Sequence, residues 1–352
     1  PVNLIFDYPP VIIRAPMESS DLRITGAHPG SGLPGGVVSI QCHGFRPGLP
    51  GVSRVWLGES EAELASASAD LIVVRLPDEP QARSLELEVD GTRSPAFPFR
   101  HGSRIASGLH PVGNPVIAPD GGVITTISGS RGQQIPRPLV RVTRQGERVA
   151  YPCDITNPTG LAFGPDGQLY ISSRSDGVVF RYTDFDHLDV FAADLGICCG
   201  IVFDSEGNLF AGDRGGIIYR LDRSGNRHEH ARLEPSVAAF HLTVDAAGNL
   251  YVTGPTLSVR DTLYRVGTGG KVEALLTGLG RPQGLAFGPD GRLWLTASFQ
   301  GRKGVFAYSP EDGSMSHQIA APTLVGVAFS GDGAWLVDGQ SVYHLPVGQS
   351  GA

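Results

Sequence analysis

A short turn unit recurs six times in the second part of the chain. Each copy is an apolar stretch, a glycine-containing turn and a second apolar stretch, as in GLAFGPDGRLWLT from Gly284. The turn glycines are separated by 40 to 46 residues and are Gly121, Gly167, Gly207, Gly248, Gly291 and Gly333. Asp-Gly between alternating apolar runs is typical of β-hairpins, and a period of about 40 residues is typical of propeller blades.

The rest of each unit extends this pattern into a four-stranded blade. A third strand is predicted at GVVFRYT, GIIYRLD, DTLYRVG and GVFAYSP, and most units continue with a fourth. Six such units predict a six-bladed β-propeller over residues 103–347. The last unit stops after three strands at SVYHLPVG, so we expect SRIASGL (103–109) to supply the missing outer strand and close the ring.

The first hundred residues follow a different pattern. Residues 1–20 form an apolar, proline-bearing extension, and residues 21–100 contain short alternating runs separated by Pro/Gly turns. Such runs predict a small β-sandwich, in which Trp56 is expected to be a core aromatic. The fold class predicted for the whole chain is therefore all-β, with an immunoglobulin-like sandwich followed by the propeller.

Composition limits the partners and the compartment. The formal net charge of −7 argues against nucleic acid as a partner, and no apolar run approaches the roughly 20 residues that cross a bilayer. The four cysteines have no spacing that suggests disulfides or a zinc knuckle. No signal peptide is visible, so we expect a cytoplasmic protein, with a mature secreted form as the alternative.

Two family resemblances follow from these motifs. The order PGSGLPGGVVSI, GF, VWLG, VRLP and VDGTRSP resembles the IPT/TIG immunoglobulin-like family, which implies a spacer or interaction module. The repeat over about 103–347 resembles the NHL and gluconolactonase (senescence marker protein) propellers. The second resemblance implies a lactonase that uses a divalent metal held by Glu, Asn and Asp just before the inner-strand glycines.

The positions that match those metal ligands carry other residues in this chain. They are Gly113, Thr159, Cys199, Phe240, Gln283 and Val325. None of them is a carboxylate, although hard divalent cations prefer oxygen ligands of that kind. We therefore expect no cofactor, with a divalent metal held at an unusual site as the alternative.

One residue later, four of the six inner strands begin with glycine, and the other two begin with Asn114 and His241. These two lie in opposite blades of a six-bladed ring. One interpretation makes His241 a general base, with Asn114 orienting a polar substrate. The alternative is that both side chains plug the channel and bond to backbone groups.

Several arginines fall in loops that open on the same face of the predicted ring. The candidate ligand-binding residues there are Arg174, Asp213, Arg214, Arg260, Arg281, Gln283 and Arg302, and Arg131 joins them from the first unit. Guanidinium groups suit carboxylates and phosphates, so this rim could bind an anion. Alternatively, each arginine pairs with a neighbouring aspartate, as Arg214 could with Asp213 and Arg260 with Asp261.

Cys198 and Cys199 also lie at a strand start beside the channel, and they join the candidate ligand-binding set either as reactive thiols or as small buried hydrophobes. The function predicted first is a gluconolactonase-like propeller without the metal triad that binds a small polar or anionic molecule, or a protein, at the channel mouth. The alternatives are a lactone or ester hydrolase centred on His241 and a scaffold protein. Homo-oligomerisation is left open.

Overall fold

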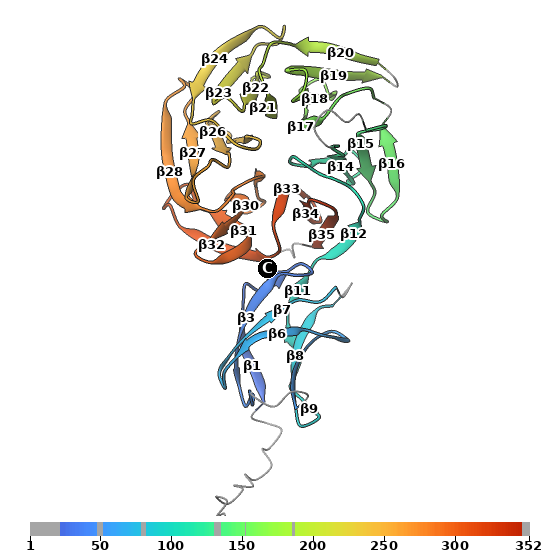
Figure 1. The fold of residues 1–352 in the computed structure, drawn as a ribbon, viewed down its shortest axis with the longest axis vertical. Coiled ribbons are helices and arrows are strands. Elements are labelled where there is room, and N and C mark those ends of the chain that lie inside the picture. The colour runs from blue at the N-terminus through green and yellow to red at the C-terminus, as the bar shows by residue number, and fades with distance from the viewer. Residues whose placement is uncertain are drawn as a thin grey trace, which may run out of the picture.

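The computed structural model describes residues 22–47, 52–78, 82–129, 135–151, 153–184 and 187–346. The predicted extension of residues 1–20 and Arg131 lie outside the described residues. The elements of the described residues are all strands, arranged as two packed sheets and a ring of further sheets (Figure 1). The all-β prediction is confirmed.

Two antiparallel sheets form the sandwich near the N-terminus. One sheet has the order β1 (Arg23–His28), β3 (Val37–His43), β7 (Leu71–Arg75) and β6 (Glu63–Ala67). The other has the order β10 (Phe97–Pro98), β8 (Ser84–Val89), β4 (Ser53–Leu57) and β5 (Ser60–Glu61), with β9 (Thr92–Arg93) beside β8. The alternating residues of both sheets pack into one buried core.

Trp56 does not belong to that core, which corrects the sequence-based expectation. Its neighbours Val55 and Leu57 are fully buried, and strand alternation turns Trp56 to the opposite face. There its indole Nε1 donates a hydrogen bond of 2.9 Å to Glu88, and the Arg93 guanidinium lies 4.4 Å from the ring centroid. Trp56 therefore stabilises the outer face of the sandwich.

The ring consists of antiparallel sheets arranged around a central axis, which is the architecture of a β-propeller (Figure 1). The first described blade contains β13 (Val116–Ile117), β14 (Val123–Thr126), β15 (Leu139–Val142) and β16 (Arg148–Tyr151). The second contains β17 (Pro158–Phe163), β18 (Leu169–Ser173), β19 (Val178–Asp184) and β20 (His187–Ala192). The third contains β21 (Cys198–Phe203), β22 (Leu209–Asp213), β23 (Ile217–Leu221) and β24 (Arg227–Arg232).

Three further blades of the described residues complete the ring. The fourth contains β25 (His241–Val244), β26 (Leu250–Thr253), β27 (Asp261–Val266) and β28 (Val272–Leu279). The fifth contains β29 (Leu285–Phe287), β30 (Leu293–Phe299), β31 (Arg302–Tyr308) and β32 (Met315–Ala320). The sixth contains β33 (Leu324–Ser330), β34 (Gly333–Asp338) and β35 (Val342–Pro346), together with β12 (Ser103–Ala106). We refer to these sheets as blades 1 to 6 in chain order.

The ends of the ring are joined as the sequence predicts. Strand β12 pairs antiparallel with β35, with Ser103 opposite His344 and Arg104 opposite Tyr343. This pairing gives the last blade its outer strand from a segment more than two hundred residues earlier. It leaves no unpaired edge on β35.

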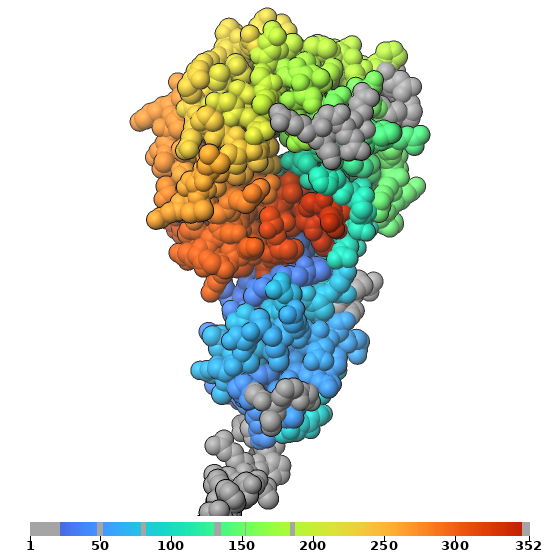
Figure 2. Space-filling view, in the orientation of Figure 1, coloured from blue at the N-terminus to red at the C-terminus, as the bar shows by residue number. Residues whose placement is uncertain are grey.

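The sandwich is attached to blade 5 by a parallel extension of that blade's sheet. Strand β2 (Ser31–Gly32) pairs with β32 through Gly32 and Ala320, and β11 (Arg100–His101) pairs with β2. The Leu33 amide donates to the Ala320 carbonyl at 2.8 Å, and Ala320 is part of the sandwich core. Figure 2 shows the sandwich seated against the orange and red end of the ring.

Gly36 makes the close approach at this junction possible. A Cβ atom built on Gly36 would lie less than 3.0 Å from the Ala320 carbonyl group, whereas one on Gly30 meets nothing within 4 Å. We expect Gly36→Ala to destabilise the protein by about 1 to 3 kcal/mol, since the backbone must shift. Gly30→Ala is the matched control and should leave the melting temperature nearly unchanged. Equal melting temperatures for the two variants in calorimetry would contradict this account.

Candidate functional site

The channel narrows sharply where the inner strands begin. A Cβ atom on Gly113, Gly160 or Gly200 would lie less than 3.0 Å from the carbonyl oxygen of the next blade's strand. The Gly200 amide also donates to the Phe240 carbonyl at 2.9 Å, which bridges blades 3 and 4. The inner strands thus approach one another at backbone contact distance, and only two of the six positions carry a side chain.

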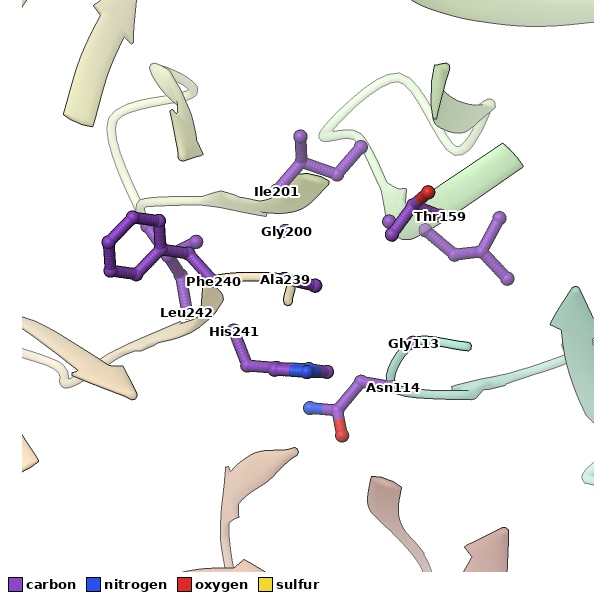
Figure 3. A pocket seen from close by; sticks show the side chains of 11 residues that line it. Gly113, Asn114, Thr159, Gly200, Ile201, Ala239, Phe240, His241 and Leu242 are labelled. Carbon is purple, nitrogen blue, oxygen red and sulfur yellow. The ribbon is translucent and has the colours of Figure 1, made fainter. Parts of the chain in front are cut away.

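Asn114 and His241 are these two residues, and Figure 3 shows their side chains pointing toward one another. The Asn114 amide Nδ2 donates to the Leu285 carbonyl at 2.7 Å, and its Oδ1 accepts from the Val327 amide at 3.1 Å. Asn114 therefore links blade 1 to blades 5 and 6. These contacts favour the interpretation in which Asn114 stabilises the channel rather than orients a substrate.

His241 lies at the start of β25 with only 3% of its surface exposed. Burial lowers the pKa of its imidazole to about 4, so the ring is neutral at pH 7. Its Nε2 has no hydrogen-bond partner among the described residues. It borders a cavity of about 20 Å³ that Asn114 and Thr159 also line. That volume admits about one water molecule, which is far less than a sugar lactone requires.

The positions that correspond to metal ligands do not fit a divalent cation. Thr159, Cys199 and Phe240 are buried, and the Gln283 Nε2 donates to the Leu324 carbonyl at 3.3 Å. Of the carboxylates in the same loops, Asp213 accepts from the Ile197 amide at 2.8 Å. Within the described ranges, no three His, Cys, Asp or Glu side chains are grouped so that they could hold a metal. We derive no chemical step through a metal at this channel.

Asp261 likewise accepts hydrogen bonds from the loops of blades 4 and 5. One of its oxygens accepts from the Thr256 amide and hydroxyl at 2.8 Å, and the other accepts from the Arg281 amide at 3.2 Å. Asp261 and Arg260 do not form an ion pair, and neither do Asp213 and Arg214. The alternative in which each rim arginine pairs with its neighbouring aspartate is therefore wrong for these two pairs.

Two half-buried arginines from neighbouring blades both lie within electrostatic reach of Cys199. Arg174 follows β18 and donates to the Ser128 hydroxyl at 2.8 Å, and Arg214 follows β22 and donates to the Val237 carbonyl at 2.7 Å. Both charges act on the thiol of Cys199. Neither guanidinium forms an ion pair with a carboxylate of the described residues.

The Arg174 side chain is supported by a network that sequence reasoning missed. The Ser128 hydroxyl also donates to Asn157 Oδ1 at 3.3 Å, and Asn157 Nδ2 donates to the Ser175 hydroxyl at 3.0 Å. Asn157 is buried and has a positive φ of 52°. The Asn157-Pro158 dipeptide at the start of β17 is the sequence signal for this turn.

The two cysteines lack the features of a nucleophile. Burial raises the pKa of the Cys199 thiol to about 12, against the opposing effect of Arg214 and Arg174, and burial also raises the pKa of Cys198. Both side chains are buried, and Cys198 belongs to the core between blades 2 and 3. The pair fits small buried hydrophobes.

The remaining predicted rim residues lie elsewhere. Arg260 is exposed in a loop whose Leu257 and Val259 are also exposed. Arg281 lines a small crevice with Lys303, and Arg302 lines a larger one beside the sandwich. Arg174 and Arg214 therefore each lie near Cys199, whereas Arg260 is in an exposed loop and Arg281 and Arg302 line other crevices.

Comparisons with known proteins agree with this architecture. No family model matches the chain. The pentonolactonase XacC of Haloferax volcanii is 29% identical over 162 residues, which is 45% of this chain and 55% of the relative. The chain thus spans about half the length of the curated relative that it matches.

Solved structures resemble the chain in fold. A putative gluconolactonase aligns over 70% of this chain and 92% of its own, with a TM-score of 0.57 and 17% identity. An auxiliary nutrient binding protein from Bacteroides ovatus aligns over 95% of this chain and 100% of its own, with a TM-score of 0.52 and 12% identity. At these identities the likeness shows the propeller fold.

The neutral buried His241 leads to a prediction about acid stability. Its pKa is lower in the folded state than the value of about 6.5 that it has when unfolded, so the unfolded state takes up a proton first as the pH falls. The resulting loss of unfolding free energy is negligible above pH 7 and grows as the pH falls from 6.5 to about 4. His241→Gln should therefore lose about 2 kcal/mol less unfolding free energy between pH 7 and pH 5 than the wild type does.

Denaturant unfolding at the two pH values measures this difference. His228→Gln is the control, because His228 is exposed on β24. A wild-type pH dependence retained in full by His241→Gln would show that folding does not lower the pKa of His241.

Proposed function

We propose that the chain is a gluconolactonase-like propeller that binds a small anionic molecule at the channel mouth without a metal. The observation that carries this proposal is the pair of half-buried guanidinium groups, Arg174 and Arg214, without carboxylate partners among the described residues. Cations placed in a partly buried site attract carboxylate or phosphate groups strongly. Hydrogen bonds to Ser128 and Val237 hold the two side chains in place, so binding costs little further side-chain entropy.

The channel geometry supports binding at the mouth rather than inside. The cavity beside His241 holds about one water molecule. A ligand therefore remains above the ring of inner-strand starts, where Arg174 and Arg214 reach it. Sugar acids are a reasonable ligand class, since the curated relative is named a pentonolactonase and such acids are the products of lactone opening.

Gluconate is a suitable probe for this site. We expect it to bind to the wild type, and we expect Arg174→Gln or Arg214→Gln to weaken binding about tenfold, the effect of one lost charge-assisted hydrogen bond. Arg227→Gln is the matched control, because Arg227 is exposed on β24 at the outer edge of blade 3. Titration calorimetry measures all four proteins.

Failure of the wild type to bind gluconate, or equal affinities in the wild type and the two mouth variants, would refute the proposal for this ligand class. The titration is made at constant ionic strength so that general screening does not mimic a site effect.

A lactone hydrolase centred on His241 is the second candidate, and the 29% identity to a pentonolactonase favours it. A neutral imidazole with an unpartnered Nε2 beside room for one water has the protonation state of a general base. This candidate requires hydrolysis of gluconolactone above the spontaneous rate, lost in His241→Gln and retained in His228→Gln. Hydrolysis that needs an added divalent cation would instead indicate a metal site of different composition.

A further inference from the structure

A surface cavity lies between the sandwich and blade 5. It has a volume of about 390 Å³ and is lined by residues from both modules. This volume falls in the range of small-molecule sites, about 300 to 1,000 Å³. We call it the junction crevice.

Its ionisable lining residues are all basic ones. The propeller contributes Arg302 and Lys303, and the sandwich contributes Arg75 and His28. Among the described residues, Arg302 and Lys303 have no carboxylate partner. Arg75 pairs with Glu63 at 3.3 Å, but the Glu63 side chain is 71% exposed and does not line the crevice. These basic side chains are exposed to solvent at the rim of the crevice, and they form a local positive patch in a protein of net charge −7.

The backbone that carries these side chains is held in place. The parallel pairing of β2 with β32 forms the join between the two modules. Nε2 of the buried His317 lies 3.1 Å from the Lys303 carbonyl, and its ring contacts that of His28 edge to face at 6.1 Å between centroids. The Arg75 Nη1 donates to the Gly35 carbonyl at 3.3 Å. Sandwich and propeller residues therefore keep a fixed spacing across the crevice.

Burial and the nearby Arg302 charge lower the pKa of His28. A neutral imidazole can still donate one N–H to an oxyanion. A second crevice of about 160 Å³ shares Lys303 and Thr323 with the first and extends to Arg281. Basic side chains thus continue from the sandwich along blade 5 toward the face that carries the channel mouth.

We propose that the junction crevice is a second ligand site that binds a small oxyanion, a carboxylate or phosphate group, between Arg302 and Lys303 of the propeller and Arg75 and His28 of the sandwich. Arginine supplies a planar donor pair and lysine a compact charge, which together suit either group. This site is independent of the one proposed at the channel mouth.

The imidazole signals of His28 report on this site directly, and they are assigned by their loss in His28→Gln. The full chain is titrated with inorganic phosphate and, separately, with succinate at constant ionic strength. We expect a saturable shift of the His28 signals with at least one of the two anions, and the one with the lower midpoint identifies the preferred group.

Arg302→Gln/Lys303→Gln should raise that midpoint about tenfold or more, because charge-assisted hydrogen bonds are lost. The matched control is Arg227→Gln/Lys271→Gln, which removes the same charges from exposed positions of blades 3 and 4. Arg174→Gln/Arg214→Gln should also leave the midpoint unchanged, which separates this site from the channel mouth. Unshifted His28 signals with both anions, or equal midpoints in the wild type and the Arg302/Lys303 variant, would overturn the proposal.

Discussion

The close approach of the inner strands around the axis is the constraint on which the rest of the ring depends. Blade starts meet at backbone distance, and glycines such as Gly160 and Gly200 are needed because a Cβ atom would strike the neighbouring strand. Asn114 and His241 are the two side chains admitted at this level, and the cavity between them has room for about one water molecule. A narrow axis stabilises the ring by bonds such as Gly200 to Phe240, and the cavity beside His241 has a volume of only about 20 Å³.

Because the axis is this narrow, a charged side chain beside it would be poorly solvated. His241 is neutral because its surroundings cannot solvate a cation. The carboxylates of Asp213 and Asp261 accept hydrogen bonds from backbone amides of the surrounding loops. Arg174 and Arg214 near Cys199, and Arg302 and Lys303 beside the sandwich, are among the described charges that form no ion pair.

The sequence predicted the features that follow from local patterns. The turn glycines gave the repeat, and the missing strand of the last unit gave the pairing of β12 with β35. It could not predict that β2 joins β32, since two residues near position 31 leave no pattern that points to position 320. Without that pairing, Arg302 appeared to belong to the channel mouth. The engagement of Asn114 and the network under Arg174 depend on side-chain contacts across blades, which one strand's sequence does not encode.

The join between β2 and β32 also changes what the sandwich can do. A module on a flexible linker loses much of its contribution to a shared site, because each binding event must order the linker. Here the sandwich core includes Ala320 of the propeller, and the Leu33 side chain packs in the core between blades 5 and 6. Each module thus inserts a residue into the other's core. Arg75 and His28 consequently line the same crevice as Arg302, and in the oxyanion site that we propose the sandwich supplies one wall.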